Sequence, residues 1–252
     1  MGGGCSSFVR DGKLYRNFDW NYSEASTVQV VCKDFKGTAF TESFDDETLG
    51  QLPYHIVDGI TNNGIMVSEH ILYNDWGFTG SGTKENPLHK IPYLLLEALK
   101  DETLLSSSLM YSYVMPIIEN IYDNVTHAIA NIVVEPELIE MEYLAQYIIT
   151  DGTATYIIMP PTSSSGSYTY VDAMTNPKLT NFRWVADTTV SRTNLQTRPT
   201  GVERWNAIDN TITLSNLRFT EAYRNPNRLS EFIGINHTTK DSTDEELLAI
   251  WE

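Results

Sequence analysis

Short apolar and alternating segments, separated by turn residues, make up the first part of the chain. Asp11-Gly12 and Asn63-Gly64 are dipeptides that favour tight hairpins, and an apolar segment lies on each side of both. This pattern predicts antiparallel strands. We expect strands over Cys5–Val9, Leu14–Asp19, Thr27–Cys32, Thr38–Phe44, Tyr54–Ile60 and Ile65–Ile71.

The spacing of apolar residues changes in the middle of the chain. Residues His89–Leu99 repeat apolar side chains at the three- and four-residue spacing of one helical face. A second helix is expected over Ser107–Tyr122, whereas Asn124–Val134 fits either a helix or a strand. The middle of the chain is therefore expected to contribute the helices that cover a sheet.

A second group of strands follows, the first two joined by Asp151-Gly152. Strands, helices, strands and helices in that order predict an α+β fold instead of repeated βαβ units. No repeat or low-complexity segment divides the chain, so residues 5–252 are expected to form one domain. We expect strands over Leu144–Thr150, Ala154–Met159, Tyr168–Val171 and Leu179–Val185, helices over Gly201–Leu214 and Asp244–Trp251, and no strand after Leu217.

Composition narrows the function without identifying it. The 252 residues include 17 basic and 33 acidic side chains, a formal net charge of −16, which opposes binding to nucleic acid or to an anionic membrane. No apolar run is long enough to cross a bilayer, and the chain does not open on a basic segment followed by an apolar one. Cys5 and Cys32 are too few for a disulfide framework. These features predict a soluble cytoplasmic protein without a nucleic-acid or membrane partner.

The sequence lacks the usual metal and cofactor motifs. None of the five histidines forms an i, i+4 pair, and there is no His-Glu-x-x-His. Residues Gly77–Lys84 approach a phosphate-binding loop, but Thr83 separates the last glycine from the lysine. We therefore expect no metal ion and no organic cofactor.

The first residues, Met1-Gly2-Gly3-Gly4-Cys5-Ser6-Ser7, allow three interpretations. Gly2 fits a myristoylation site and Cys5 a second, palmitoylated site, which would make the chain a lipid-anchored protein. Cys5 could instead be a buried residue that begins a strand. In the third interpretation, residues 1–4 are a leader, and their removal makes Cys5 the first residue of the mature chain.

An N-terminal cysteine carries a nucleophile and a base on one residue. The reference pKa is about 8.5 for the thiol and about 7.7–8.0 for an α-amino group, so the amine can accept the thiol proton without a histidine. The leader could be removed by attack of the Cys5 thiol on the Gly4 carbonyl, which is autoprocessing, or by an aminopeptidase. With Met1–Gly4 attached, this nitrogen is an amide, and the chain is expected to be an inactive precursor.

Cys5-Ser6-Ser7-Phe8, followed by Asp11–Trp20 with Arg16-Asn17-Phe18-Asp19 inside it, resembles the opening of the choloylglycine hydrolase family. This family of linear amide C–N hydrolases includes bile salt hydrolases and penicillin V acylases, and it is similar to the acid ceramidase group. Further segments resemble later motifs of the family in the same order. They are Asp58–Ile65, Tyr147–Gly152, Leu179–Asn181 and Gly201–Trp205.

The resemblance implies an N-terminal nucleophile fold, an αββα sandwich of two antiparallel sheets between helix layers. It also implies a set of catalytic residues, drawn from four of the matching segments. Cys5 would be nucleophile and base, Arg16 would stabilise the thiolate, Asp19 would orient the amine, Asn181 would help to position the amine and form the oxyanion site, and Arg204 would complete the polar network.

Some assignments within the resemblance stay open. Asn176 competes with Asn181 for the same role. The family often supplies an oxyanion residue just after the second hairpin, and that position falls near Ile71, with Asn74 reached only by a shift. Family members are also usually longer at the C-terminus, so the chain would be a compact or shortened member.

The expected activity is hydrolysis of a linear, non-peptide amide through a thioester on Cys5. Conjugated bile salts, penicillin V and other small N-acyl amides are the candidate substrates that the resemblance implies. The alternatives are an acyltransferase on the same scaffold, in which an amine resolves the thioester, and the lipid-anchored, non-catalytic member. Family resemblance further implies a homotetramer.

Overall fold

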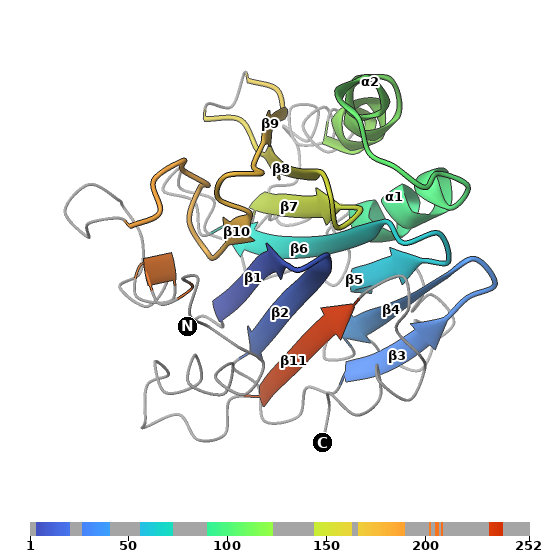
Figure 1. Cartoon of the computed structure of the whole chain (residues 1–252), viewed down its shortest axis with the longest axis horizontal. Helices are drawn as coiled ribbons and strands as arrows, with labels where there is room; N and C mark the ends of the chain where they lie inside the picture. The colour runs from blue at the N-terminus through green and yellow to red at the C-terminus, as the bar shows by residue number, and fades with distance from the viewer. Residues whose placement is uncertain are drawn as a thin grey trace, which may run out of the picture.

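The fold comes from a computed structural model of the chain (Figure 1). It describes residues 4–20, 27–40, 56–72, 90–122, 144–162, 166–189 and 232–238, together with Val202, Trp205, Asn206 and Ile208. Two antiparallel sheets and a helical layer account for most of these residues.

The smaller sheet is built on the hairpin of β1 (Gly4–Arg10) and β2 (Lys13–Trp20). Its turn places Asp11 and Gly12 at φ values of 51° and 74°, the left-handed pair that a two-residue hairpin requires. The short strand β10 (Lys178–Leu179) pairs with β1, and β11 (Phe232–Thr238) pairs with β2. The strand order is β10-β1-β2-β11, and the pairs are antiparallel.

The larger sheet has seven strands in chain order, from β3 to β9, and each strand is antiparallel to its neighbours. Because consecutive strands are neighbours, short turns suffice for three of the connections, β3–β4, β5–β6 and β7–β8. The strands are β3 (Thr27–Val31), β4 (Phe35–Phe40), β5 (Ile56–Thr61), β6 (Met66–Leu72), β7 (Leu144–Thr150), β8 (Thr155–Met159) and β9 (Thr169–Asp172).

Helices cover one face of the larger sheet (Figure 1). They are α1 (Ile91–Leu99), and a second helical segment made of α2 (Ser107–Leu109), the π-helical turn η3 (Met110–Val114) and residues 115–122, which are α-helical. Gly59 allows α1 to approach β5 closely, since a Cβ there would lie 2.6 Å from Leu96 Cδ1. Among the described residues, no helix is long and apolar enough to cross a membrane.

Two apolar cores hold the layers together. One lies between the helices and the larger sheet and includes Ile91, Leu95 and Tyr147. The other lies between the two sheets and includes Leu14, Met66, Ile148, Ile157 and Leu179. The α+β prediction is confirmed, and the two stacked antiparallel sheets with helices outside match the expected sandwich.

The structure corrects the sequence prediction at three places. The expected strand Leu179–Val185 is limited to Lys178–Leu179, because backbone carbonyls beyond it accept hydrogen bonds from a side chain instead of a neighbouring strand. The strand expected over Thr38–Phe44 begins earlier, at Phe35, directly after a turn in which Cys32 N donates to the Phe35 carbonyl; residues 41–44 lie outside the described residues.

The prediction of no strand after Leu217 is wrong, because β11 adds an edge strand to the smaller sheet. Its partner β2 lies far away in the sequence, so no hairpin turn next to β11 indicates the pairing. The segments Asn124–Val134 and Asp244–Trp251 lie outside the described residues, as does most of Gly201–Leu214.

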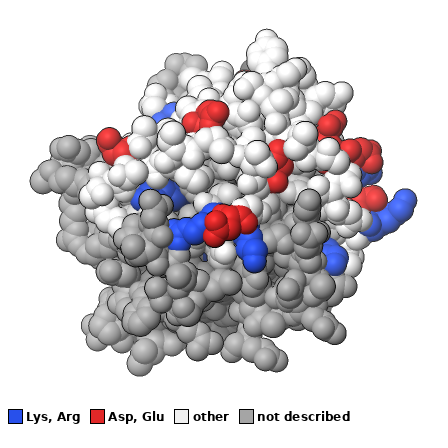
Figure 2. All heavy atoms as spheres, in the orientation of Figure 1, with Lys and Arg blue, Asp and Glu red and all other residues white. Residues whose placement is uncertain are grey.

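Charges are distributed over the surface. On the face that Figure 2 draws, acidic and basic side chains of the described residues lie scattered among uncharged atoms. The formal charge of −16 is therefore a property of the whole chain and not of one described patch on this face.

Candidate active site

In strands β2 and β6, the side chains that face the space between the two sheets change from apolar to polar along the strand. In β2, Leu14 is followed on the same face by Arg16, and in β6, Met66 is followed by Ser68 and then His70. The apolar residues belong to the core between the sheets, and the polar ones continue the same rows. The polar end consists of Cys5, Ser7, Arg16, Asp58, Ser68 and His70, which are all buried.

Cys5 is the second residue of β1 and lies at this polar end. Only 3% of its surface is exposed. Its sulfur is 3.6 Å from Nη2 of Arg16, and its backbone N–H donates to Oδ1 of Asn181 at 2.6 Å. Both atoms that the N-terminal nucleophile interpretation uses, the sulfur and the nitrogen of Cys5, therefore have a polar neighbour of the expected kind.

Arg16 lies opposite Ser7 in the hairpin and reaches across to the larger sheet. Nη1 donates to Oδ2 of Asp58 at 2.9 Å, and Nη2 donates to the backbone carbonyl of Glu69 at 3.0 Å. Burial on its own lowers the pKa of Arg16, but attraction to Cys5 and then Asp58 outweighs it, so the pKa is raised above its ordinary value. A permanent positive charge thus stands beside the sulfur, an environment that favours a thiolate over a thiol.

Asn181 is fixed by a buried glutamine on the neighbouring sheet. Nε2 of Gln146 donates to the carbonyls on both sides of Asn181, at 2.9 Å to Thr180 and 2.7 Å to Phe182. The competing residue Asn176 lies elsewhere: its Nδ2 is within 3.0–3.3 Å of three carbonyls in the segment 185–187. Of the two asparagines, the structure brings only Asn181 to Cys5.

A second polar contact joins the sheets beside Cys5. Ser7 Oγ lies 2.6 Å from Nε2 of His70 and 3.3 Å from Oγ of Ser68. Ser7 follows Cys5 by two residues and therefore shares its face of β1. The contact fixes β1 against β6 next to the nucleophile candidate.

The two other sequence candidates are described only in part or not at all. Asp19 is paired through its backbone with Gly4, the residue before Cys5, and its side chain lies outside the described residues. Arg204 lies outside them entirely, as does Asn74. The neighbouring Trp205 packs on Phe182, with ring centroids 4.9 Å apart, and its carbonyl accepts from Nζ of Lys178.

Sequence reasoning assigned no role to Asp58 or Gln146. Both are buried polar residues on the inward face of strands whose neighbouring inward positions are apolar, Ile60 and Ile148. A polar residue that interrupts an apolar row of a strand is a signal that can be recognised in a sequence, because an unpaired polar group there would be costly. Identifying its partner needed the structure.

No family model and no curated protein matches the sequence. Among solved structures, a Caenorhabditis elegans N-acylethanolamine-hydrolyzing acid amidase ortholog matches at 8% identity, over 99% of this chain and 97% of that one, with a TM-score of 0.42. A mutant conjugated bile acid hydrolase from Clostridium perfringens matches at 14% identity, over 95% and 90%, with a TM-score of 0.44.

Both are amide hydrolases. With TM-scores below 0.5, these likenesses carry no argument about activity, which has to come from the contacts around Cys5. In the part of the chain that the structure describes, no three His, Cys, Asp or Glu side chains gather as metal ligands. The chemistry available at the polar end is that of a buried thiol between a guanidinium and an amide.

Proposed function

We propose that the chain is an amide hydrolase of the N-terminal nucleophile type, with Cys5 as its nucleophile and a small N-acyl amide as its substrate. The observation that carries this proposal is the position of the Arg16 guanidinium, 3.6 Å from the Cys5 sulfur, while Asn181 accepts the N–H of the same cysteine. A buried arginine whose pKa is raised partly by the cysteine favours the charge state that attacks a carbonyl.

The reaction follows from these positions. The thiolate forms a bond to the substrate carbonyl carbon, and negative charge collects on the carbonyl oxygen. When the C–N bond breaks, the leaving amine takes the proton that the α-amine of Cys5 had accepted from the thiol. Water then attacks the thioester, releases the carboxylic acid and restores the thiol.

Removal of residues 1–4 is part of this proposal. Gly4 pairs with Asp19, so loss of the leader would leave the new amine of Cys5 next to the backbone position of that aspartate. The leader bond can be cut by the same chemistry: the thiol attacks the Gly4 carbonyl, the peptide C–N bond breaks to give a thioester and a free amine, and water hydrolyses the thioester. The leader 1–4 and the domain 5–252 remain predictions.

Intact mass distinguishes the lipid-anchor alternative. A palmitoyl chain and the proposed acyl-enzyme would both be attached to the same buried sulfur, so the burial of Cys5 does not separate them, whereas added acyl mass on Gly2 would favour the anchor. The acyltransferase alternative shares every step up to the thioester. It is distinguished by adding a primary amine to the reaction and measuring amide product against free acid.

Intact mass spectrometry and activity assays test the proposal together. We compare the full chain with a variant in which residues 2–4 are deleted, so that removal of Met1 exposes Cys5. The trimmed chain is expected to hydrolyse at least one member of a panel of conjugated bile salts, penicillin V and N-acylethanolamines. The full chain is expected to be active only after it has lost the mass of Met1–Gly4.

Cys32 offers a matched control for Cys5. Burial, followed by the nearby Glu97 and Asp34, raises the pKa of Cys32, so this thiol is expected to be the less reactive one. Cys5→Ser is expected to abolish thioester formation, detected as an acyl adduct by mass spectrometry, whereas Cys32→Ser is expected to leave it intact. Unchanged hydrolysis in Cys5→Ser would refute the proposed nucleophile.

A further inference from the structure

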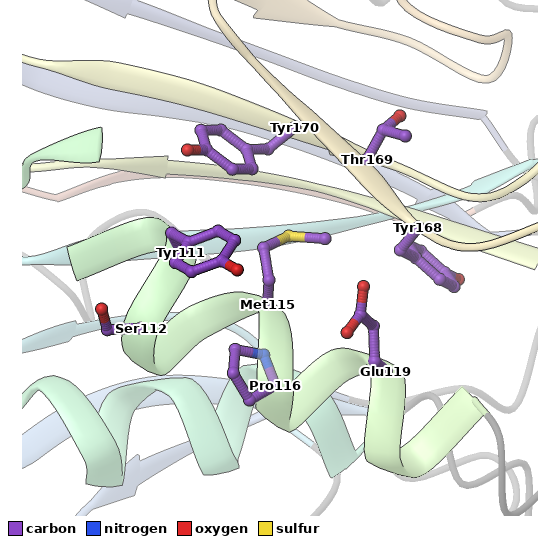
Figure 3. Close-up of a pocket in the computed structure, with 8 residues that line it drawn as sticks. All are labelled: Tyr111, Ser112, Met115, Pro116, Glu119, Tyr168, Thr169 and Tyr170. Atoms are coloured by element: carbon purple, nitrogen blue, oxygen red, sulfur yellow. The ribbon is translucent and has the colours of Figure 1, made fainter. Parts of the chain in front are cut away.

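A groove of about 710 Å³ lies between the second helical segment and the edge strand β9, on the opposite face of the larger sheet from Cys5 (Figure 3). Tyr111, Met115 and Glu119 line it from the helical side, and Tyr168 and Tyr170 from the strand side. Ser112, Pro116 and Thr169 complete the lining. Figure 3 shows the Glu119 carboxylate pointing from the helix toward Tyr168, which directly precedes β9.

The aromatic walls are held in place before any ligand arrives. The Tyr168 hydroxyl donates to the Ala145 carbonyl at 2.9 Å, and its ring meets Tyr122 edge-on at 5.2 Å. The Tyr170 hydroxyl donates to the Ser107 carbonyl at 3.2 Å, which joins β9 to the start of α2. A site with rigid walls loses little entropy when it binds.

Tyr111 is unusual because 75% of its large aromatic side chain is exposed, yet it lines the groove. Tyrosine faces carry negative charge density and attract cations. Glu119 adds a full negative charge, and among the residues that the structure describes, no lysine or arginine forms an ion pair with it. The formal charge of −16 draws cations toward the protein as a whole.

We propose that this groove binds a small organic cation with an alkylated ammonium head. An alkylated ammonium matches both parts of the lining, since its methyl groups contact tyrosine rings and the Met115 thioether while its charge faces Glu119. An anionic or neutral apolar ligand would instead cover the carboxylate without neutralising it, which is costly. The proposal does not depend on the amidase function.

Choline and its neutral isostere 3,3-dimethylbutan-1-ol test the charge requirement. Both are titrated into the full chain by calorimetry or by ¹H NMR line broadening. Choline is expected to bind about 5- to 30-fold more tightly, the range that a cation–π interaction supplies between exposed and desolvated sites. Equal affinity for the two compounds, or no binding of choline at millimolar concentration, would overturn the proposal.

Three variants test the location. Tyr111→Ala is expected to weaken choline binding at least about 3-fold, whereas Tyr113→Ala, which removes a 56% exposed tyrosine outside the groove, is expected to have no effect. Glu119→Gln is expected to weaken choline binding while leaving the isostere unchanged. Circular dichroism checks that each variant is folded. Loss of binding in Tyr113→Ala but not in Tyr111→Ala would show that choline binds elsewhere.

Discussion

Asp58 is the residue through which the larger sheet holds the Arg16 guanidinium, and Asp58→Asn tests that contact. The ion pair has a distance of 2.9 Å, and both side chains are 3% exposed. Removing one charge of such a pair leaves the other buried without compensation, at a cost of about 3–5 kcal/mol of unfolding free energy. For a chain of this length, that corresponds to a fall in melting temperature of roughly 10 °C.

Activity should fall further than stability alone explains. Without the carboxylate, Nη1 of Arg16 loses its charged partner, and the guanidinium is no longer fixed against the Cys5 sulfur. A displacement of about 1 Å at a reacting group can cost about 10²-fold in rate. We expect a loss of that order in kcat/KM for the trimmed chain, measured well below the melting temperature of the variant.

A double variant separates the two effects. Arg16→Met with Asp58→Leu removes both charges, and apolar replacement of a buried pair is often neutral for stability. The double variant is expected to recover most of the melting temperature and none of the activity. Asp34→Asn, which removes the half-exposed partner of Lys100, is the matched control and should change neither. A melting temperature of Asp58→Asn within 1 °C of wild type would refute the reasoning.

Three further changes follow from other contacts. Gln146→Met leaves the two carbonyls beside Asn181 without their donor, so we expect the free energy of unfolding in urea to fall by about 1–3 kcal/mol and kcat/KM to fall as well. An unchanged kcat/KM would contradict the positioning role of Gln146. Gly59→Ala places a Cβ 2.6 Å from the backbone carbonyl oxygen of Lys36 as well as from Leu96 Cδ1, and should cost about 1–3 kcal/mol in urea unfolding; an unchanged free energy of unfolding would contradict this close packing. Burial raises the pKa of Tyr147 well above its usual range, so above about pH 10 this side chain ionises only in the unfolded chain, and the free energy of unfolding falls as the pH rises. Tyr147→Phe should make this fall less steep by about 1.4 kcal/mol per pH unit, and the same pH dependence in variant and wild type would contradict the reasoning.

Local patterns were sufficient to predict much of the fold. The hairpin around Asp11-Gly12 and the strands on both sides of Asp151-Gly152 follow from turn chemistry and alternation, which act between close neighbours in the sequence. The helix at Ile91–Leu99 follows from its apolar spacing. Strand β11 was missed because, among the described strands, it pairs with β2 alone, and a long-range pairing leaves no local turn signal.

The candidate site also contains residues that local patterns predict and residues that depend on long-range contacts. The pair of Cys5 and Arg16 was expected from the motif around the first hairpin, and the hairpin register brings their side chains to one face. Asp58 and Gln146 were not assigned, because each acts on a residue more than thirty positions away. Sequence reasoning identifies residues that share a hairpin, whereas contacts between sheets depend on how the sheets stack.

The candidate site lies at the polar end of the inter-sheet space, beside the apolar core and not within it. Replacing Leu14 or Met66 with polar residues would leave buried groups without partners, so the apolar half has to hold the sheets together. The polar half adds specificity, since Arg16 and Ser7 have partners only in one register of the two sheets. A one-residue slip of β6 would turn His70 and Ser68 away from Ser7 and expose Met66 to the wrong face. The contacts around Cys5 are therefore also contacts that fix the stacking of the sheets.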